Sequence, residues 1–456
     1  MLLPSLQRVR NSPLFSSSFV YFVVSLSTLI GLVISTLNAR PIQDDYAILY
    51  LISDHGIFGF LELTWRTHGG NLTPMLINAL FLYPSVFGLN FWALSLFPLA
   101  NYALLVISIF SVSAILNPFT SRNFTKIQIL TFANLVFLGS ESLFSPQFLE
   151  MTLFSSAVLV HLWPILFFFL AFGLLNKDTK ASLGLIALLG FMSGNSNISE
   201  SLFIQLSCLL ILLLSKYQSS FIVEVKRLYL FALSNLAGAI MILSAPGFWA
   251  RASEKNVQGI PDQFGEIAFR FAKSLAVFSA DVLSHPMLLI FVIIGYKFSS
   301  NGGNFIKKFS TFGVLLFILL FISLVLGATI AYPAWHQSIG LVLLSPFVGM
   351  SIGDWLGSQK RITPKTGRVF FFIAVVVVSI SLTRAFWNIE SRAQRWDSGF
   401  SQNYCAVLSK ESDALIGTET IYPISNLGIE DMNRWPWMRD AFTGWVTNSK
   451  FSAKDC

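Results

Sequence analysis

The sequence predicts an all-α integral membrane protein with about eleven transmembrane helices, interfacial helices in the first outer loop and a small outer C-terminal tail. Two observations support this prediction. Hydrophobic residues make up 54% of the 456 residues and charged residues only 12%, whereas a soluble chain has about 25% charged residues. Apolar runs long enough to cross a bilayer also recur along most of the chain, separated by short polar loops.

Eleven apolar runs are candidate membrane spans. The first of them follows Arg8 and Arg10 and is too long for the hydrophobic region of a signal peptide, so we expect a retained anchor. In chain order the runs are Phe19–Leu37, Phe91–Leu116, Ile127–Phe144, Ala157–Leu175, Ala181–Gly194, Ile198–Ser215, Leu228–Ser244, a run ending near Tyr296, Thr311–Ala331, Ser338–Trp355 and Val369–Trp387.

The distribution of charge predicts the topology. Thr73–Tyr83 is apolar but only about half a span, and we expect it to lie along the membrane surface. With that assignment, 16 of the 30 basic residues face one side with three acidic residues, Asp178, Glu224 and Asp354. The other side has 20 of the 23 acidic residues and all five histidines. Because basic loops stay in the cytoplasm, the N-terminus is predicted inside and the C-terminus outside.

This topology divides the chain into two parts. Residues 1–387 form the polytopic domain, in which the outer loops 38–90 and 245–285 are the long ones, and residues 388–456 form a non-cytoplasmic tail. Cys405 and Cys456 both lie in the tail, where a disulfide is permitted, whereas Cys208 lies in a span. The basic residues form no continuous stripe and no CxxC pair occurs, which argues against nucleic-acid binding and a structural zinc site.

An acidic pair follows the first span. Asp44 and Asp45 stand at the membrane boundary, where desolvating two carboxylates is costly unless they are used or paired. One could be a general base for a hydroxyl group or part of a cation site, and one could instead cap a helix. Because adjacent helical residues diverge by about 100°, we expect one carboxylate to face a cavity, with Asp45 favoured, and Tyr46 to pack against the membrane surface.

A polar and aromatic cluster precedes Thr73–Tyr83. Trp65 offers a stacking face, and Gly69 and Gly70 permit close approach of the backbone to a ligand. A turn with an interfacial tryptophan is the alternative interpretation. The polar members of this candidate substrate site are Arg66, His68 and Asn71.

A basic pair follows the seventh span. Pro246 and Gly247 end that run, and Arg251 and Lys255 follow on the outer side, where basic residues are scarce. This position predicts a phosphate ligand, and contact with ordinary phospholipid headgroups is the alternative. The further candidates on the outer face are Glu141 and Glu200 for substrate and His336 for phosphate.

Together these features resemble the GT-C superfamily of polytopic membrane glycosyltransferases, and within it bacterial O-antigen-type glucosyltransferase-like proteins with a DDY motif after the first helix. The resemblance covers the layout of most of the chain but rests on short motifs. The chain departs from the pattern at Asn71, where relatives have arginine. The matching residues are Asp44–Tyr46, Trp65 with Gly69 and Gly70, Pro246 and Gly247 with Arg251, and His161–Pro164.

The resemblance implies a hexosyltransferase of cell-envelope polysaccharide biosynthesis in the bacterial inner membrane, with its active site on the non-cytoplasmic face. Such an enzyme moves a sugar from a polyprenyl-phosphate donor to a hydroxyl group of a glycan or lipid acceptor, with inversion. It implies Asp45 and Asp44 as catalytic residues, and it leaves open a divalent cation, Mg²⁺ or Mn²⁺. The implied donor-phosphate ligands are Arg251, Lys255 and His336, and the implied substrate ligands are Tyr46, Trp65, Arg66, His68, Asn71, Glu141 and Glu200.

Two other classes of protein remain alternatives. An O-antigen polymerase or ligase also has many spans and a large outer loop, but it relies on arginines rather than on an acidic pair. A lipid or solute transporter is expected to have internal repeats and ionisable residues near the middle of the bilayer. The sequence has no evident repeat, and its ionisable residues lie near the predicted outer boundary.

Overall fold

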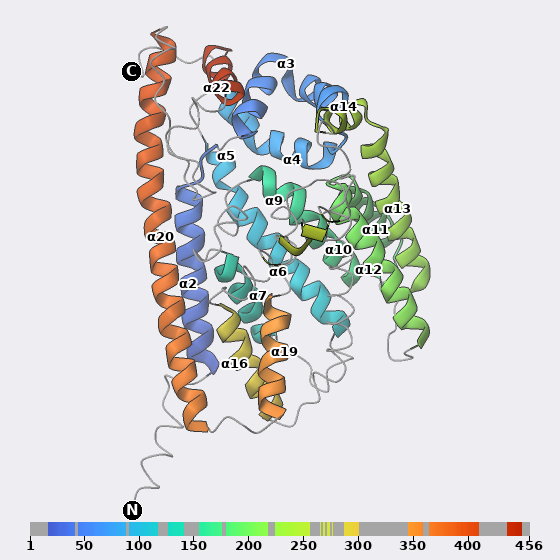
Figure 1. The fold of residues 1–456 in the computed structure, drawn as a ribbon, viewed down its shortest axis with the longest axis vertical. Coiled ribbons are helices and arrows are strands. Elements are labelled where there is room, and N and C mark those ends of the chain that lie inside the picture. Colours follow the sequence, from blue (N-terminus) through green and yellow to red (C-terminus); the bar gives the residue numbers. More distant parts are fainter. Residues whose placement is uncertain are drawn as a thin grey trace, which may run out of the picture.

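The structure is a computed structural model of a helical bundle (Figure 1). It describes residues 17–41, 44–87, 91–116, 126–140, 155–175, 179–217, 224–255, 287–300, 345–358, 364–409 and 436–448, with a few positions between 265 and 276. Within these residues every regular element is a helix, which confirms the predicted all-α class. The number of membrane spans stays a prediction.

The helices follow the predicted apolar runs closely. Each predicted span that falls in the described residues contains a helix, and Thr311–Ala331 lies outside them. In chain order the helices are α2 (Ser17–Leu37), α3 (Asp44–Thr67), α4 (Leu72–Leu82), the 3₁₀ turn η2 (Tyr83–Val86), α5 (Trp92–Ser95), α6 (Phe97–Leu116), α7 (Lys126–Ser140), α9 (Ser155–His161), α10 (Trp163–Leu174), α11 (Lys180–Gly194), α12 (Ile198–Tyr217), α13 (Val225–Ser244), α14 (Pro246–Lys255), α16 (Met287–Ser300), α19 (Ser345–Ser358), α20 (Pro364–Leu408) and α22 (Pro436–Asn448).

Local sequence explains several helix ends. The side chain of Thr179 accepts a hydrogen bond from the backbone N–H of Ser182 at 3.2 Å and caps the start of α11. Pro164 occupies the first turn of α10, where a missing N–H costs nothing. Pro246 cannot continue α13 and instead begins α14. No proline interrupts residues 365–408, and α20 therefore continues past residue 388, the start of the predicted tail, for 45 residues in all.

Among the described residues, three helical segments are long and apolar enough to cross a membrane. By length and composition these are Asp44–Thr67, Trp92–Ser111 and Val225–Ser244. The long helices α2, α13 and α20 also expose large apolar side chains, including Phe22, Leu233 and Phe372. A soluble monomer rarely exposes so much contiguous apolar surface.

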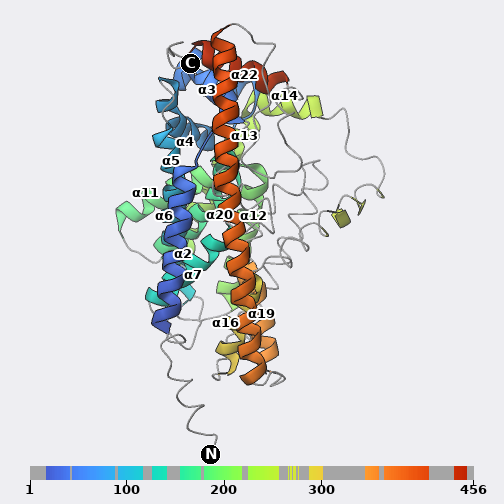
Figure 2. The same ribbon diagram turned by 90° about the vertical axis from the view of Figure 1, so that its left-hand side faces the viewer.

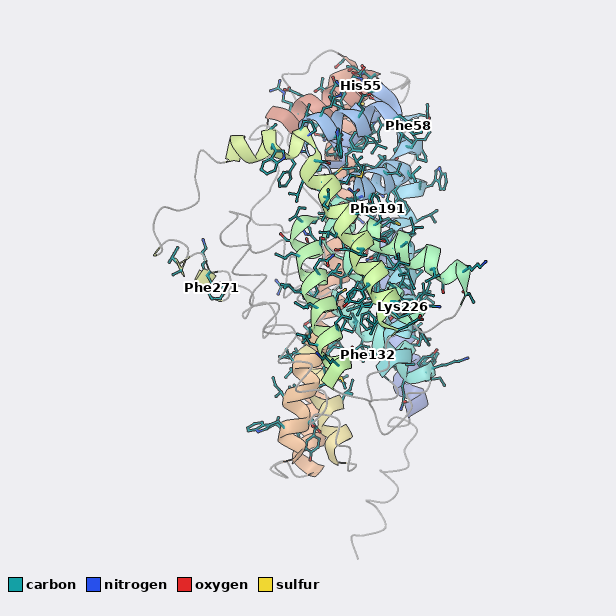
Figure 3. The ribbon with its side chains drawn as sticks, turned by 90° about the vertical axis from the view of Figure 1, so that its right-hand side faces the viewer. His55, Phe58, Phe132, Phe191, Lys226 and Phe271 are labelled. Carbon is teal, nitrogen blue, oxygen red and sulfur yellow. The ribbon has the colours of Figure 1, made fainter. Side chains whose placement is uncertain are left out.

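One of these three segments is not a straight rod. Helix α3 bends at Gly56, whose φ of 69° and ψ of 175° are non-helical and available to glycine. Helices α3, α4, α14 and α22 gather at one end of the molecule, whereas α2 and α20 run side by side along its length (Figures 1 and 2). His55 and Phe58 of α3 lie at this end, and Lys226 lies further toward the other (Figure 3).

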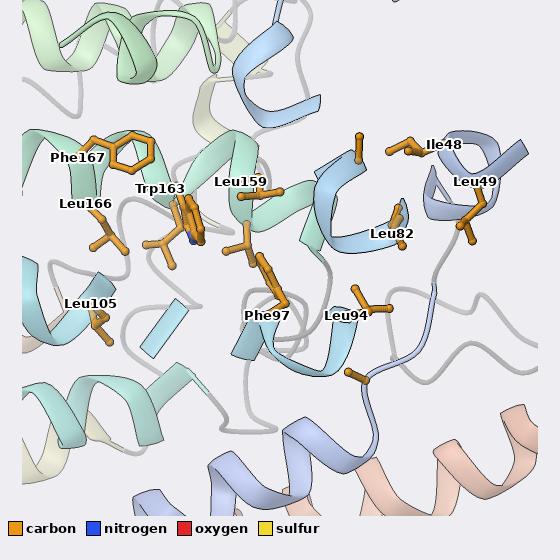
Figure 4. Packing of buried hydrophobic residues seen from close by; sticks show 14 of the residues in the cluster. Ile48, Leu49, Leu82, Leu94, Phe97, Leu105, Leu159, Trp163, Leu166 and Phe167 are labelled. Carbon is orange, nitrogen blue, oxygen red and sulfur yellow. The ribbon is translucent and has the colours of Figure 1, made fainter. Parts of the chain in front are cut away.

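The core joins this end layer to the bundle below it. Side chains of α3, α4, α6, α9 and α10 meet in one apolar cluster (Figure 4). The rings of Phe97 and Trp163 stack at its centre, with centroids 6.1 Å apart and an interplanar angle of 12°. The indole N–H of Trp163 donates to the side-chain oxygen of Asn101 at 3.2 Å, so this buried polar atom is satisfied. The acidic motif on α3 is therefore attached directly to the core.

Candidate functional site

The two carboxylates of the acidic pair point in different directions. Asp44 and Asp45 both lie in the first turn of α3, where the helix N-terminus favours negative charge. Asp44 is exposed, whereas Asp45 is 0% exposed. The separation of the two side chains agrees with the divergence expected from a helix, and it leaves Asp45 as the carboxylate that faces the interior.

Asp45 lies in a buried cluster of polar side chains. Its Oδ1 accepts hydrogen bonds from Ser156 Oγ at 2.9 Å and from Asn78 Nδ2 at 3.2 Å. Ser155 Oγ lies 3.2 Å from the same oxygen and 2.8 Å from Asn78 Oδ1, and its single proton can serve either acceptor. Asn78 Nδ2 also donates to Ser156 Oγ at 2.7 Å. Hydrogen bonds from neutral groups are what a carboxylate needs if it is to remain buried.

Sequence reasoning missed Asn78, Ser155 and Ser156. Asn78 had a visible signal, because it is the only strongly polar residue within the apolar run of α4. A buried asparagine in a run of this kind needs partners, and Asp45 is one of them. Ser155 and Ser156 begin α9 and gave no such signal, because serine is common at helix starts.

Tyr46 contacts the C-terminal helix. Its ring lies edge-on to that of Phe442, with centroids 5.5 Å apart, and 6.1 Å from that of Trp445. Both partners belong to α22 and are fully buried. The expected packing of Tyr46 against the membrane surface is therefore wrong, because the tail helix covers the residue.

A second buried polar cluster contains Glu200. Its Oε1 lies 2.7 Å from Nδ1 of His161, and both side chains are buried. Asn197 Nδ2 lies 3.3 Å from the same ring nitrogen. Glu200 comes from the first turn of α12 and His161 is the last residue of α9. Glu200 was a predicted substrate ligand, and His161 begins one of the motifs of the resemblance; the structure brings the two together.

The same short helix contributes to both clusters. Ser155 at the start of α9 contacts Asp45, and His161 at its end contacts Glu200. Six residues of helix advance about 9 Å along the axis. The Asp45 cluster and the His161–Glu200 pair are therefore neighbouring but separate sites.

The polar residues of the first outer loop lie mostly at the surface. Trp65 is half-buried, and Arg66 and His68 are exposed. Arg66 pairs with Glu62 at 2.7 Å, four residues earlier on the same helix. Asn71 precedes α4 and makes no capping hydrogen bond with its side chain.

The glycines of this loop pack against the end of α13. A Cβ added at Gly70 would lie 2.5 Å from Ile242 Cα and 2.9 Å from Ala245 Cβ, and one added at Gly247 would lie 2.5 Å from His68 N. Asn195 joins the same contact, because its Nδ2 donates to the backbone oxygen of Gly70 at 2.9 Å. Because they lack side chains, Gly70 and Gly247 allow the segment before α4 to pack directly against the junction of α13 and α14.

Gly70→Ala is expected to destabilise the protein by about 1–3 kcal/mol, because backbone and Cβ atoms rather than flexible side chains occupy the space of the new methyl group. Gly184→Ala is the matched control. No atom of the described residues lies within 4 Å of the position that a Cβ would take at Gly184 in α11. Alanine there is expected to stabilise the helix by about 0.5–1 kcal/mol. Thermal unfolding of both purified variants tests this, and equal shifts would contradict it.

The structure describes the backbone of only some of the remaining candidate residues. Arg251 and Lys255 belong to α14, which packs against α3 and follows α13 directly. Glu141 and His336 lie outside the described residues. Cys405 is disulfide-bonded and Cys208 is free and buried, in agreement with the predicted disulfide, whose other half lies outside the described residues. In the described part of the chain, no group of three His, Cys, Asp or Glu residues could hold a metal ion.

Comparison with known proteins adds no assignment. No protein-family model, curated protein or solved structure matches the chain.

Proposed function

We propose that the protein is a membrane glycosyltransferase of the GT-C type. It moves a sugar from a polyprenyl-phosphate donor to a hydroxyl group of a cell-surface glycan or lipid, at the non-cytoplasmic face of a bacterial inner membrane. The observation that supports this most is the burial of Asp45, at the start of a bent helix and within a cluster of neutral hydrogen-bond donors.

Asp45 is the general base in this proposal. The acceptor oxygen forms a bond to the anomeric carbon, the bond from that carbon to the phosphate oxygen breaks, and polyprenyl phosphate leaves. The proton of the acceptor hydroxyl passes to the Asp45 carboxylate. A weak base of this kind is more effective when it is removed from water, and Asp45 meets that condition whereas the exposed Asp44 does not.

The hydrogen bonds around Asp45 allow a hydroxyl group to bind there. Ser155 has two acceptors, Asp45 Oδ1 and Asn78 Oδ1, and the second is the closer. Ser155 can therefore donate to Asn78 while an acceptor hydroxyl takes its place on the carboxylate. Ser155 keeps one hydrogen bond and the carboxylate accepts as many as before, so binding leaves no buried donor unsatisfied.

Helix α14 is the proposed binding element for the donor phosphate. It lies at the same end of the molecule as α3 (Figure 1) and packs against it. Arg251 and Lys255 are its basic residues. An arginine fork binds phosphate oxygens more specifically than a lysine ammonium, so Arg251 is the principal ligand in this proposal. The lipid chain of the donor would lie between the apolar helices.

The proposed topology places α3 outside and the start of α13 inside. We expect a maleimide that does not cross membranes to label His55→Cys in intact spheroplasts, and to label Lys226→Cys only after permeabilisation. Both positions are exposed and lie toward different ends of the molecule (Figure 3). Cys208 and Cys405 should not react, because Cys208 is buried and Cys405 is disulfide-bonded, and the unsubstituted protein gives the background labelling. The opposite labelling pattern would overturn the topology.

The proposed activity is tested with the purified protein in nanodiscs. The donors are a panel of polyprenyl phosphates that carry different radiolabelled monosaccharides, and the acceptors are envelope glycans and lipids. We expect at least one label to move to an acceptor with release of one polyprenyl phosphate for each sugar. Retention of the label on every donor by folded protein would refute the proposal.

A further inference from the structure

The buried carboxylate of Glu200 has an oxygen that makes no hydrogen bond within the described part of the chain. Oε1 of Glu200 contacts Nδ1 of His161 at 2.7 Å, but Oε2 of the same carboxylate is buried and makes no hydrogen bond. The residue as a whole is only 5% exposed. An acceptor that is removed from water without a partner is costly, so this oxygen is a position where a donor from a ligand would be stabilising.

Two features hold the Glu200 carboxylate in place. The residue lies in the first turn of α12, a position where acidic side chains are favoured. Its Oε1 lies 2.7 Å from Nδ1 of His161, within hydrogen-bond distance. His161 therefore holds Oε1, and Oε2 is left to bind another donor.

We propose that Glu200 and His161 form a sugar-binding subsite in which Oε2 of Glu200 accepts a hydrogen bond from a hydroxyl group of the glycan. His161 is the positioning residue. This inference rests on the proposed function and assigns part of the substrate to a second site. The two sites lie at opposite ends of α9, about 9 Å apart along the helix axis. The Glu200 subsite therefore binds a part of the substrate away from the reacting hydroxyl.

A hydroxyl group fits this site better than a metal cation. Mg²⁺ and Ca²⁺ take six or more oxygen ligands, often from several carboxylates. The Glu200 carboxylate instead contacts a ring nitrogen of His161, and Asn197 Nδ2 lies 3.3 Å from the same nitrogen. A carboxylate with one oxygen already bound and the other without a hydrogen bond is suited to a single neutral donor.

Binding of methyl glycosides to the protein in nanodiscs tests the subsite. The probes are the methyl glycosides of glucose, galactose, mannose, rhamnose and N-acetylglucosamine, with binding followed by calorimetry. We expect at least one to bind saturably, and Glu200→Gln to raise its Kd about tenfold, because a neutral hydrogen bond replaces a charge-assisted one. Glu390→Gln makes the same change at an exposed position of α20 and should leave Kd unchanged.

Glu200→Gln should keep the fold, since its remaining oxygen can accept from His161. If its thermal unfolding nevertheless shows a loss of structure, Glu200→Asp replaces it. That variant keeps the charge and withdraws the carboxylate by one methylene, and the same rise in Kd is expected. Saturable binding of Mg²⁺ or Na⁺ that Glu200→Gln abolishes, with no glycoside binding, would identify a cation site and overturn the proposal.

The two proposals fail in different ways. If wild-type protein transfers sugar and Glu200→Gln leaves both the glycoside Kd and the acceptor KM unchanged, the subsite is refuted and the transferase stands. If no transfer occurs but a glycoside binds through Glu200, the subsite stands as a sugar-binding site and the enzymatic proposal is refuted. Asp45→Asn should retain glycoside binding, because its cluster is separate.

Discussion

Asp45→Asn is expected to lower sugar transfer about 100-fold or more, in line with the contribution of a general base. Asparagine keeps the shape of the side chain and one acceptor oxygen for Ser156 and Asn78, but it cannot take a proton. We therefore expect expression and thermal unfolding close to those of the wild type. The measurement is the rate of label transfer in nanodiscs at saturating donor.

Asp44→Asn is the matched control for this prediction. It makes the same chemical change one residue earlier in the same helical turn, at an exposed side chain. We expect transfer within about twofold of the wild-type rate, since surface substitutions rarely matter away from a site. Near-normal transfer by both variants would falsify the catalytic role and leave helix stabilisation as the function of the pair.

Trp445→Ala is expected to lower the free energy of unfolding by about 3–5 kcal/mol. Trp445 is 0% exposed, and its ring lies 6.1 Å from those of Tyr46 and Phe442 and 6.0 Å from that of Phe400. Truncation leaves a cavity between α22, α3 and α20 that cannot easily collapse, because all three helices are held by other contacts. Unfolding by denaturant in detergent, followed by circular dichroism, measures the loss.

Trp387→Ala provides the comparison. Trp387 is on α20 and is 71% exposed, so its removal deletes the same side chain without creating a cavity. We expect a change of about 0.5 kcal/mol or less. Because α22 covers Tyr46, directly after Asp45, Trp445→Ala should also make the tail more susceptible to protease and reduce transfer. Equal stability losses in the two variants would contradict the role assigned to the tail helix.

Composition and periodicity were enough to predict the helices. The apolar runs at Phe19–Leu37 and Leu228–Ser244 correspond to α2 and α13 within a few residues. The extent of such a helix follows from the hydrophobicity of consecutive residues, which the sequence shows directly. The different directions of Asp44 and Asp45 followed from helical geometry alone. The helical geometry left open which of the two faces inward, although Asp45 was favoured.

Contacts between distant segments could not be predicted in the same way. Asn78 and Ser156 come from helices 33 and 111 residues beyond Asp45. The contact of Tyr46 with α22 joins the first outer loop to the C-terminal tail. Neither pairing can be predicted from a single sequence, because several other polar or aromatic residues occur at positions with the same local periodicity. The pairing of His161 with Glu200 was missed for the same reason, although each residue had been noted separately.

The central claim is that the protein breaks the bond between a sugar and a polyprenyl phosphate, and a doubly labelled donor tests it most directly. The donor carries ³H in the sugar and ³²P in the phosphate, and it is placed in the outer leaflet of sealed proteoliposomes that contain the wild-type protein or Asp45→Asn. With the wild type we expect ³H to appear on the acceptor in equal amount to free ³²P-labelled polyprenyl phosphate, at a rate that falls about 100-fold in Asp45→Asn. Movement of the intact donor to the inner leaflet, with both labels still joined, would contradict the claim and identify a transporter.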